Sequence, residues 1–187
     1  MAADLGESGR QSVMTGETPT ALVVMGPSGV GKSTTAEALA VALGWPFAEA
    51  DQFHPAANIA KMTAGVPLDD VDRAPWLAEI RDWIVGQARA GHSTVLTCSA
   101  LKHRYRDVLR ESGARVRFVA LTADPGLVAA RLAQRSGHYM PETLLQSQFD
   151  ALEPLGPDED GVTVAVDVPP HAVVSRVLER LGLAAAG

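Results

Sequence analysis

The chain has 187 residues, of which 47% are hydrophobic, and it carries a formal net charge of −6. This length suits one α/β domain with a sizeable core, and the acidic balance argues against a nucleic-acid scaffold or a protein held on a membrane surface, because both usually present a basic face. Cys98 is the single cysteine, so the sequence excludes an internal disulfide and holds no cysteine cluster for zinc.

The first stretch, residues 1 to about 18, is small and polar and predicts a disordered tail before a single domain at residues 19–187. It lacks a basic segment followed by an apolar core, so no secretory signal is expected. No uninterrupted apolar run approaches the ~20 residues that a membrane span needs. We therefore expect a soluble, cytoplasmic protein.

The domain that follows alternates short β-rich runs with helical patterns. Strands are expected at 20–25, 46–50, 93–99, 115–121 and 162–168. Apolar residues at helical spacing predict helices over 36–43, 76–87, 105–109, 145–152 and 174–181, with further helices beginning near Pro55 and running from about 125 to 135. This alternation is typical of an α/β fold with a mostly parallel sheet and helices on both faces.

The segment between the first strand and the first helix has the sequence of a phosphate-binding loop. Residues 26–33, GPSGVGKS, satisfy G-x-x-x-x-G-K-[ST] in the strand-to-helix context that the motif requires. The glycines let several backbone N–H groups point at one anion at the positive end of the helix dipole. A glycine-rich turn that binds nothing is the alternative, and the agreement of motif and context argues against it.

Within this loop each residue type has a separate task. Lys32 is expected to reach the β- and γ-phosphates of a nucleotide, and the Ser33 hydroxyl to bind Mg²⁺, with Thr34 or Thr35 adding a phosphate contact. The residues assigned to the nucleotide here are Gly26, Ser28, Gly29, Val30, Gly31, Lys32, Ser33 and Thr34.

Two features of other phosphate-loop proteins are missing from the sequence. The third strand, STVLTCS, ends without the aspartate of a Walker B strand, and no N-K-x-D stretch for guanine selection occurs. The chain also has no room for the large insertions of motors. By elimination, a small-molecule kinase is favoured over a switch or a motor.

Polar residues follow the carboxyl ends of the strands, where ligands bind in an open parallel sheet. Asp51 and His54 come after the second strand. Asp51 is the candidate to orient or to deprotonate an acceptor hydroxyl, and it could also hold Mg²⁺ through water. The alternative is that it caps the helix that begins near Pro55. His54 either binds the substrate or is a local cap. Glu49 is a second candidate carboxylate near Mg²⁺.

Two pairs of basic residues follow the third and fourth strands. Arg131 and Arg135 are four residues apart and precede the break SGHYMP, which predicts a small mobile lid at about 131–141 that closes its guanidinium groups on ATP phosphates. Lys102 and Arg106 are also four apart and could hold an anionic group. A solvated helix face is the alternative for both pairs.

Four stretches together resemble bacterial gluconokinases of the short, phosphate-loop type. These stretches are GPSGVGKST (26–34), DQFHPAANIAKMTAGVPLDDVDRAPWL (51–77), CSALKHRYRDVLR (98–110) and LVAARLAQRSGHYMPETLLQSQFDALEPL (127–155). The resemblance covers about residues 20–182. It implies a P-loop NTPase fold with a five-stranded parallel sheet in the order 2-3-1-4-5, a homodimer, and transfer of the ATP γ-phosphate to the 6-hydroxyl of D-gluconate with Mg²⁺.

The resemblance also distributes roles among residues. Lys32, Asp51 and Arg131 would be catalytic, with Ser33 and Asp51 near Mg²⁺. The residues that would face gluconate are Asp51, His54, Lys61, Arg73, Lys102, Arg106 and His138. Arg131 and Arg135 would belong to the lid, and an arginine of the lid with the Pro169–Pro170 loop is our candidate for the adenine pocket. No nucleic-acid or membrane partner is expected.

Two other functions remain in competition. A related small-molecule kinase is disfavoured because shikimate kinases usually show D-x-D where this chain has Glu49-Ala50-Asp51, and thymidylate-type kinases D-R-[YH] where it has Asp72-Arg73-Ala74. An ATP-dependent regulator that binds nucleotide without turnover would leave the lid and the acceptor-side groups without a purpose.

Overall fold

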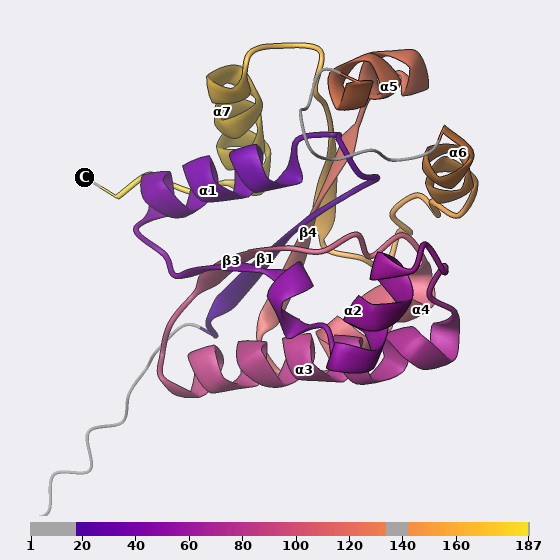
Figure 1. Cartoon of the computed structure of the whole chain (residues 1–187). Helices are drawn as coiled ribbons and strands as arrows, with labels where there is room; N and C mark the ends of the chain where they lie inside the picture. The colour runs from indigo at the N-terminus through magenta and orange to yellow at the C-terminus, as the bar shows by residue number, and fades with distance from the viewer. Residues whose placement is uncertain (1–17, 134–141, 187) are drawn as a thin grey trace, which may run out of the picture.

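The computed structural model describes residues 18–133 and 142–186 (Figure 1). Almost all of the expected tail, and the expected lid from residue 134 to 141, lie outside the described residues. Among the described residues, no helix has the length and apolar character to cross a membrane.

A parallel five-stranded sheet forms the centre of the described chain. Its strands are β1 (Thr20–Met25), β2 (Phe47–Glu49), β3 (Thr94–Thr97), β4 (Arg115–Thr122) and β5 (Gly161–Ala165). Their spatial order is β2-β3-β1-β4-β5, and every neighbouring pair is parallel, which confirms the predicted order. The second, third and fifth strands are shorter than predicted.

Helices connect the strands and cover both faces, as predicted. They are α1 (Lys32–Leu43), the 3₁₀ turn η1 (Ala50–Phe53), α2 (Ala56–Thr63), α3 (Asp70–Arg89), α4 (His103–Arg110), α5 (Pro125–Ala133), α6 (Glu142–Asp150) and α7 (Pro170–Leu181). In Figure 1, α1 and α7 lie on one face and α3 and α4 on the other, while α5 and α6 lie beyond the carboxyl end of the sheet.

The helix α3 begins six residues before the predicted apolar face because its first turn is polar. The Asp69 carboxylate accepts a hydrogen bond from the Asp72 amide (2.8 Å), and the Asp72 carboxylate accepts one from the Asp69 amide (3.0 Å). This reciprocal capping box satisfies N–H groups that would otherwise lack partners. The sequence between Asp69 and Trp76 is therefore helical without an apolar stripe.

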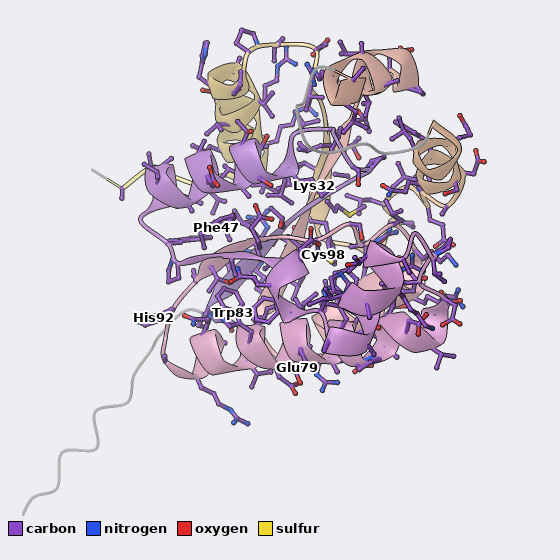
Figure 2. All side chains as sticks on the ribbon, viewed as in Figure 1. Lys32, Phe47, Glu79, Trp83, His92 and Cys98 are labelled. Carbon is purple, nitrogen blue, oxygen red and sulfur yellow. The ribbon has the colours of Figure 1, made fainter. Side chains whose placement is uncertain are left out.

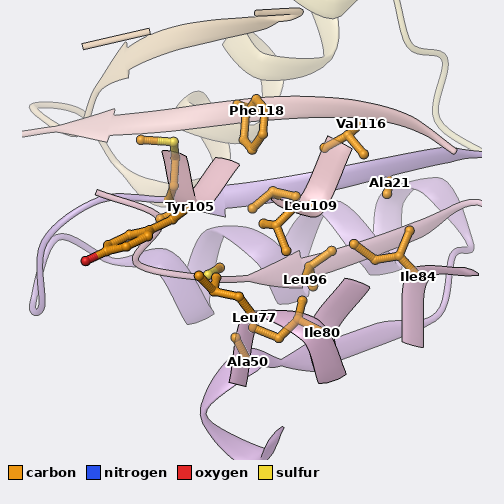
Figure 3. Close-up of a cluster of buried hydrophobic side chains, with 14 of the residues drawn as sticks. Ala21, Ala50, Leu77, Ile80, Ile84, Leu96, Tyr105, Leu109, Val116 and Phe118 are labelled. Atoms are coloured by element: carbon orange, nitrogen blue, oxygen red, sulfur yellow. The ribbon is translucent and has the colours of Figure 1, made fainter. Parts of the chain in front are cut away.

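The two sides of the sheet each bury a separate apolar cluster. Alternate residues of β1 divide between them: Ala21, Val23 and Met25 face α3 and α4, while Leu22 and Val24 face α1 and α7. Figure 3 shows the first cluster, with Ile80 and Ile84 of α3 close to Leu96 of β3. A strand buried on both faces reads as a continuous apolar run, as TALVVM does.

Cys98 directly follows β3 and is 2% exposed. Burial raises the pKa of its thiol to about 12. The thiol is therefore protonated and inert at neutral pH, in agreement with a core position.

Candidate functional site

The loop after β1 adopts a backbone that only glycine allows at three positions. Gly26, Gly29 and Gly31 have φ values of 139°, 80° and 106°. A Cβ on Gly26 would lie 2.8 Å from the carbonyl oxygen of Leu121 in β4. The loop consequently curls tightly into α1, whose N-cap Gly31 makes no side-chain capping bond, and the first amides of the helix face the loop.

Side chains around the loop show which of its groups are engaged. The Lys32 ammonium donates to the carbonyl oxygen of Pro27 (3.0 Å), and the hydroxyl-bearing Ser33 and Thr34 are exposed. Thr35 is 3% exposed, so of the two threonines only Thr34 is accessible to a phosphate. Figure 2 shows Lys32 where α1 begins.

The helices α5 and α6 rest directly on the loop. The Ser28 amide donates to the side-chain carbonyl oxygen of Gln148 in α6 (2.7 Å). Leu132 of α5 packs so closely on Gly29 that a Cβ there would lie 2.7 Å from its side chain. The Gln148 carboxamide oxygen therefore accepts a hydrogen bond from a loop amide that could otherwise donate to a phosphate oxygen. Sequence reasoning missed Gln148, because its approach depends on how α6 is placed.

Asp51 lies in η1, just beyond the end of β2. Its side chain is 91% exposed, and His54 Nε2 lies 4.0 Å from its Oδ1 atom. The N-cap of α2 is Pro55, and no side chain caps that helix, so the capping alternative for Asp51 is wrong. Its carboxylate oxygens are available to a ligand.

Trp76 of α3 fixes the backbone that carries Asp51. Its indole N–H donates to the carbonyl oxygen of Ala50 (2.8 Å), and both residues are buried. The His54 ring stacks on the Trp76 ring, with centroids 4.5 Å apart and planes 10° apart. Burial lowers the pKa of His54 against the opposing effect of the Asp51 carboxylate. His54 is therefore a neutral imidazole near neutral pH, within hydrogen-bond range of Asn58 (3.4 Å).

A second group of polar side chains surrounds Tyr105 at the start of α4. The Tyr105 hydroxyl and the Arg104 guanidinium donate to Asp70 of α3, and Lys102 Nζ lies 3.4 Å from the same carboxylate. The hydrogen bond from Tyr105 is the main reason that the pKa of Asp70 is lowered. Three cations surround the Tyr105 ring, with Arg73, Lys102 and Arg104 at 5.8, 5.6 and 5.5 Å from its centroid.

The structure thus brings together Arg73 and Lys102, which the family resemblance assigns to the substrate, and adds Arg104 and Tyr105 to them. Within the described part of the chain, Arg73 has no carboxylate at ion-pair distance although it is half-buried. An unpaired, partly desolvated guanidinium favours an anionic ligand.

Lys61 and Glu49 are engaged by the protein itself. Lys61 forms an ion pair with Asp72 (2.5 Å), and the hydrogen bond from this pair is the main reason that the pKa of Lys61 is raised. Glu49 accepts a hydrogen bond from the hydroxyl of Thr97 at the end of β3. The first contact links α2 to α3, and the second links the ends of β2 and β3.

The prediction that Arg106 contacts the substrate is wrong. Its side chain is 0% exposed and forms an ion pair with the equally buried Glu159. The expected shared face with Lys102 does not exist, because Lys102 is the extended N-cap of α4 and Arg106 is one turn inside that helix, facing the core. No part of the guanidinium reaches the solvent.

The remaining candidates lie around the ends of β4 and β5. Arg131 of α5 donates to the carbonyl oxygen of Val166 (3.2 Å), in the segment that leads to the exposed Pro169. A cavity of about 350 Å³ opens nearby, lined by Thr122, Ala123, Asp124, Leu127, Ala165 and Asp167. Arg135 and His138 lie outside the described residues.

Comparison with known proteins gives one consistent result. A family model described as an AAA domain matches residues 22–155. The chain is similar to the gluconokinase of Gluconobacter oxydans, with 48% identity over 87% of this chain and 91% of that protein.

Two solved structures are also similar to it. A sugar kinase from Janibacter sp. HTCC2649 is 47% identical, with a TM-score of 0.83 over 88% of this chain and 95% of that one. A gluconokinase from Sinorhizobium meliloti is 43% identical, with a TM-score of 0.79 over 89% and 93%.

Proposed function

The chain belongs to the gluconokinase family, and from this premise we propose that it transfers the γ-phosphoryl group of ATP to the 6-hydroxyl of D-gluconate, giving 6-phospho-D-gluconate. Relatives named gluconokinase match most of its length at 38–48% identity. The reaction needs positioning and charge stabilisation rather than covalent catalysis, since the phosphoryl-transfer transition state is loose.

One observation carries the acceptor side of this proposal. Asp51 leaves its carboxylate exposed, whereas the neighbouring carboxylates Glu49, Asp70 and Asp72 are each engaged by a donor from the protein. A carboxylate without a protein donor, at the same carboxyl end of the sheet as the phosphate loop, can accept a hydrogen bond from the sugar hydroxyl. It can thereby direct the hydroxyl oxygen at the γ-phosphorus. Neutral His54 lies beside it and can hydrogen-bond a further hydroxyl.

On the nucleotide side, the amides of residues 26–33 and Lys32 would hold the β- and γ-phosphates as the bond to the leaving oxygen breaks. Arg131, with Arg135, would add positive charge to the transferred group, and Pro169 would lie against the adenine. Residues 19–187 would form one kinase domain, with a lid at about 131–141.

The oxygen-bearing side chains present suit Mg²⁺. Ser33 and Asp51 are exposed, and no group of three His, Cys, Asp or Glu able to hold a metal occurs in the ranges 18–133 and 142–186. Mg²⁺ is commonly bound by few protein ligands together with substrate phosphates. When bound there, it would neutralise charge on the phosphates.

The acid end of gluconate would meet the cations around Tyr105, chiefly Arg73 and Lys102, with Lys61 nearby on α2. We further propose a homodimer, which is supported by large apolar side chains that remain exposed on and after α2, namely Ile59, Met62, Val66 and Val71. A cytoplasmic location fits an enzyme that consumes ATP.

A coupled assay of ADP release tests the function. We expect turnover with gluconate and MgATP, and none with shikimate or nucleoside monophosphates. Lys32→Ala should abolish most of this rate, and chelation of Mg²⁺ should abolish it as well. Nucleotide binding without any gluconate-dependent turnover would refute the proposal and favour a non-catalytic regulator.

A further inference from the structure

Arg106 and Glu159 form a two-point ion pair inside the protein. Arg106 Nε lies 2.5 Å from Glu159 Oε1, and Nη2 lies 2.9 Å from Oε2, with both side chains 0% exposed. Burial acts to raise the pKa of Glu159, but the hydrogen bonds and charge of Arg106, with the amide of Gly156, outweigh it, so that this pKa is lowered. Both partners are therefore ionised.

The rest of the guanidinium binds two loops that are distant in sequence. Its Nη1 lies 3.1, 3.4 and 3.1 Å from the carbonyl oxygens of Ala100, Leu101 and Glu153, and its Nη2 lies 3.1 Å from that of Pro154. The loop between β3 and α4 is thereby tied to the segment that leaves α6. Only a fork of donors such as arginine can serve a carboxylate and several carbonyls at once.

The first of these loops has a conformation that needs outside support. Ala100 has φ 41°, the left-handed region that residues with a Cβ rarely adopt. Its neighbour Ser99 accepts a hydrogen bond from the Gly26 amide of the phosphate loop (3.3 Å). Lys102, two residues after Ala100, lies among the cations around Tyr105. A shift of this loop would therefore displace Lys102 directly, whereas it reaches the phosphate loop through this single backbone hydrogen bond.

We propose that Arg106 is a positioning residue for phosphoryl transfer: held by Glu159, it keeps the 99–102 loop in the conformation that sets Lys102 against the substrate. This inference rests on the proposed function. Stability alone does not account for the pair, because well-packed apolar side chains of similar volume stabilise a protein interior as well or better. An apolar pair could not hold the carbonyl oxygens of the loop.

The test compares two conservative variants, each of which replaces a mostly buried arginine. Arg106→Lys keeps the charge and loses the fork. Arg117→Lys is the matched control. Arg117 also pairs with a carboxylate, that of Asp160 (3.0 Å), which follows Glu159 directly in the sequence, and it donates to the carbonyl oxygen of Leu181 (2.8 Å). Arg117 lies level with Leu22 in β1, toward the amino end of the sheet and away from the phosphate loop.

We expect both variants to lose thermal stability, and only Arg106→Lys to lose function per folded molecule. Its KM for gluconate should rise and its kcat fall, each by about 10-fold or more, since small misplacements near reacting groups are costly. Its Kd for MgATP, measured by calorimetry, should change by less than about 3-fold. Unchanged kcat and KM in Arg106→Lys, or equal losses in Arg117→Lys, would overturn the proposal.

Glu159→Gln provides a second variant, because it keeps the side-chain shape and removes the counter-charge. We expect the same split between KM for gluconate and nucleotide Kd, in a smaller degree. Wild-type kinetics in this variant would also contradict the proposal. If the wild-type protein itself does not phosphorylate gluconate, the proposed function fails; if it does and the variants behave as wild type, only the positioning role fails.

Discussion

Replacing Trp76 with phenylalanine removes one hydrogen bond and part of one ring from the support of Asp51. The indole N–H is the donor to the buried Ala50 carbonyl, and the indole ring is the surface on which His54 stacks. Phenylalanine keeps an aromatic ring at this position but has no donor. The perturbation therefore reaches η1 while leaving every ligand-facing group chemically intact.

The expected cost follows from these contacts. An unsatisfied buried carbonyl costs about 1–3 kcal/mol. The lost volume, roughly 40 Å³ at about 24 cal/mol per Å³, adds about 1 kcal/mol. The free energy of unfolding should fall by about 2–4 kcal/mol, which at a urea m-value of about 2 kcal/mol/M lowers the unfolding midpoint by about 1–2 M. Because η1 carries Asp51, kcat should fall about 10-fold or more.

Trp83→Phe is the control, since it makes the same change on the same helix. Trp83 is partly buried against Phe53, with ring centroids 6.0 Å apart, and its indole N–H has no acceptor among the described residues. Because phenylalanine keeps a ring against Phe53, the last residue of η1, the substitution should cost about 1 kcal/mol or less and lower kcat far less than Trp76→Phe does. Urea unfolding and steady-state kinetics measure both quantities. Equal effects of the two substitutions would refute the argument that the hydrogen bond to Ala50 holds the catalytic loop.

Three further predictions concern single side chains. Asp51→Asn should lower kcat about 100-fold or more at unchanged melting temperature, because the carboxylate is exposed and has no hydrogen-bond partner in the described structure; a near-normal rate would contradict its role. Gln148→Ala should tighten MgATP binding about 3- to 10-fold in calorimetry, because the Ser28 amide loses a competing acceptor; weaker binding would instead make Gln148 a nucleotide ligand. The hydrogen bond with Asp107 is the main reason that the pKa of His103 is raised. Protonated His103 therefore stabilises the folded protein fully below about pH 6.5, and this stabilisation is lost as the pH rises through the folded-state pKa. His103→Gln should flatten the decline in melting temperature above that pH, and an unchanged slope would count against this pair.

The site was predictable where its groups are close in sequence. Lys32 and Ser33 follow the glycines of the loop directly, so spacing alone placed them at the start of α1. Asp51 and His54 come just after a strand, and parallel strands bring such positions to one edge. The strand order came from family resemblance, because alternation of strands and helices is compatible with several orders.

Arg106 and Trp76 show why other roles could not be predicted. The i, i+4 spacing of Lys102 and Arg106 suggested one exposed face, but α4 begins only at His103 and Arg106 turns toward Glu159, 53 residues away in sequence. Trp76 begins the apolar face predicted over residues 76–87, but its contact with Ala50 joins residues 26 apart in sequence, which no helical spacing indicates. The residues near Trp76 and Arg106 in sequence do not indicate that Ala50 and Glu159 are their partners.

The amino-acid sequence by itself determined the phosphate loop, since glycine torsions, the lysine and the hydroxyl act over eight consecutive residues. It also determined which residues carry charge. Only the tertiary structure decided which charged groups are left for a ligand. The Asp51 carboxylate stays exposed, whereas Asp70 accepts hydrogen bonds from Tyr105 and Arg104. Arg106 is paired with Glu159. The physical reason is that pairing depends on distance in space, and the packing of helices on the sheet sets that distance.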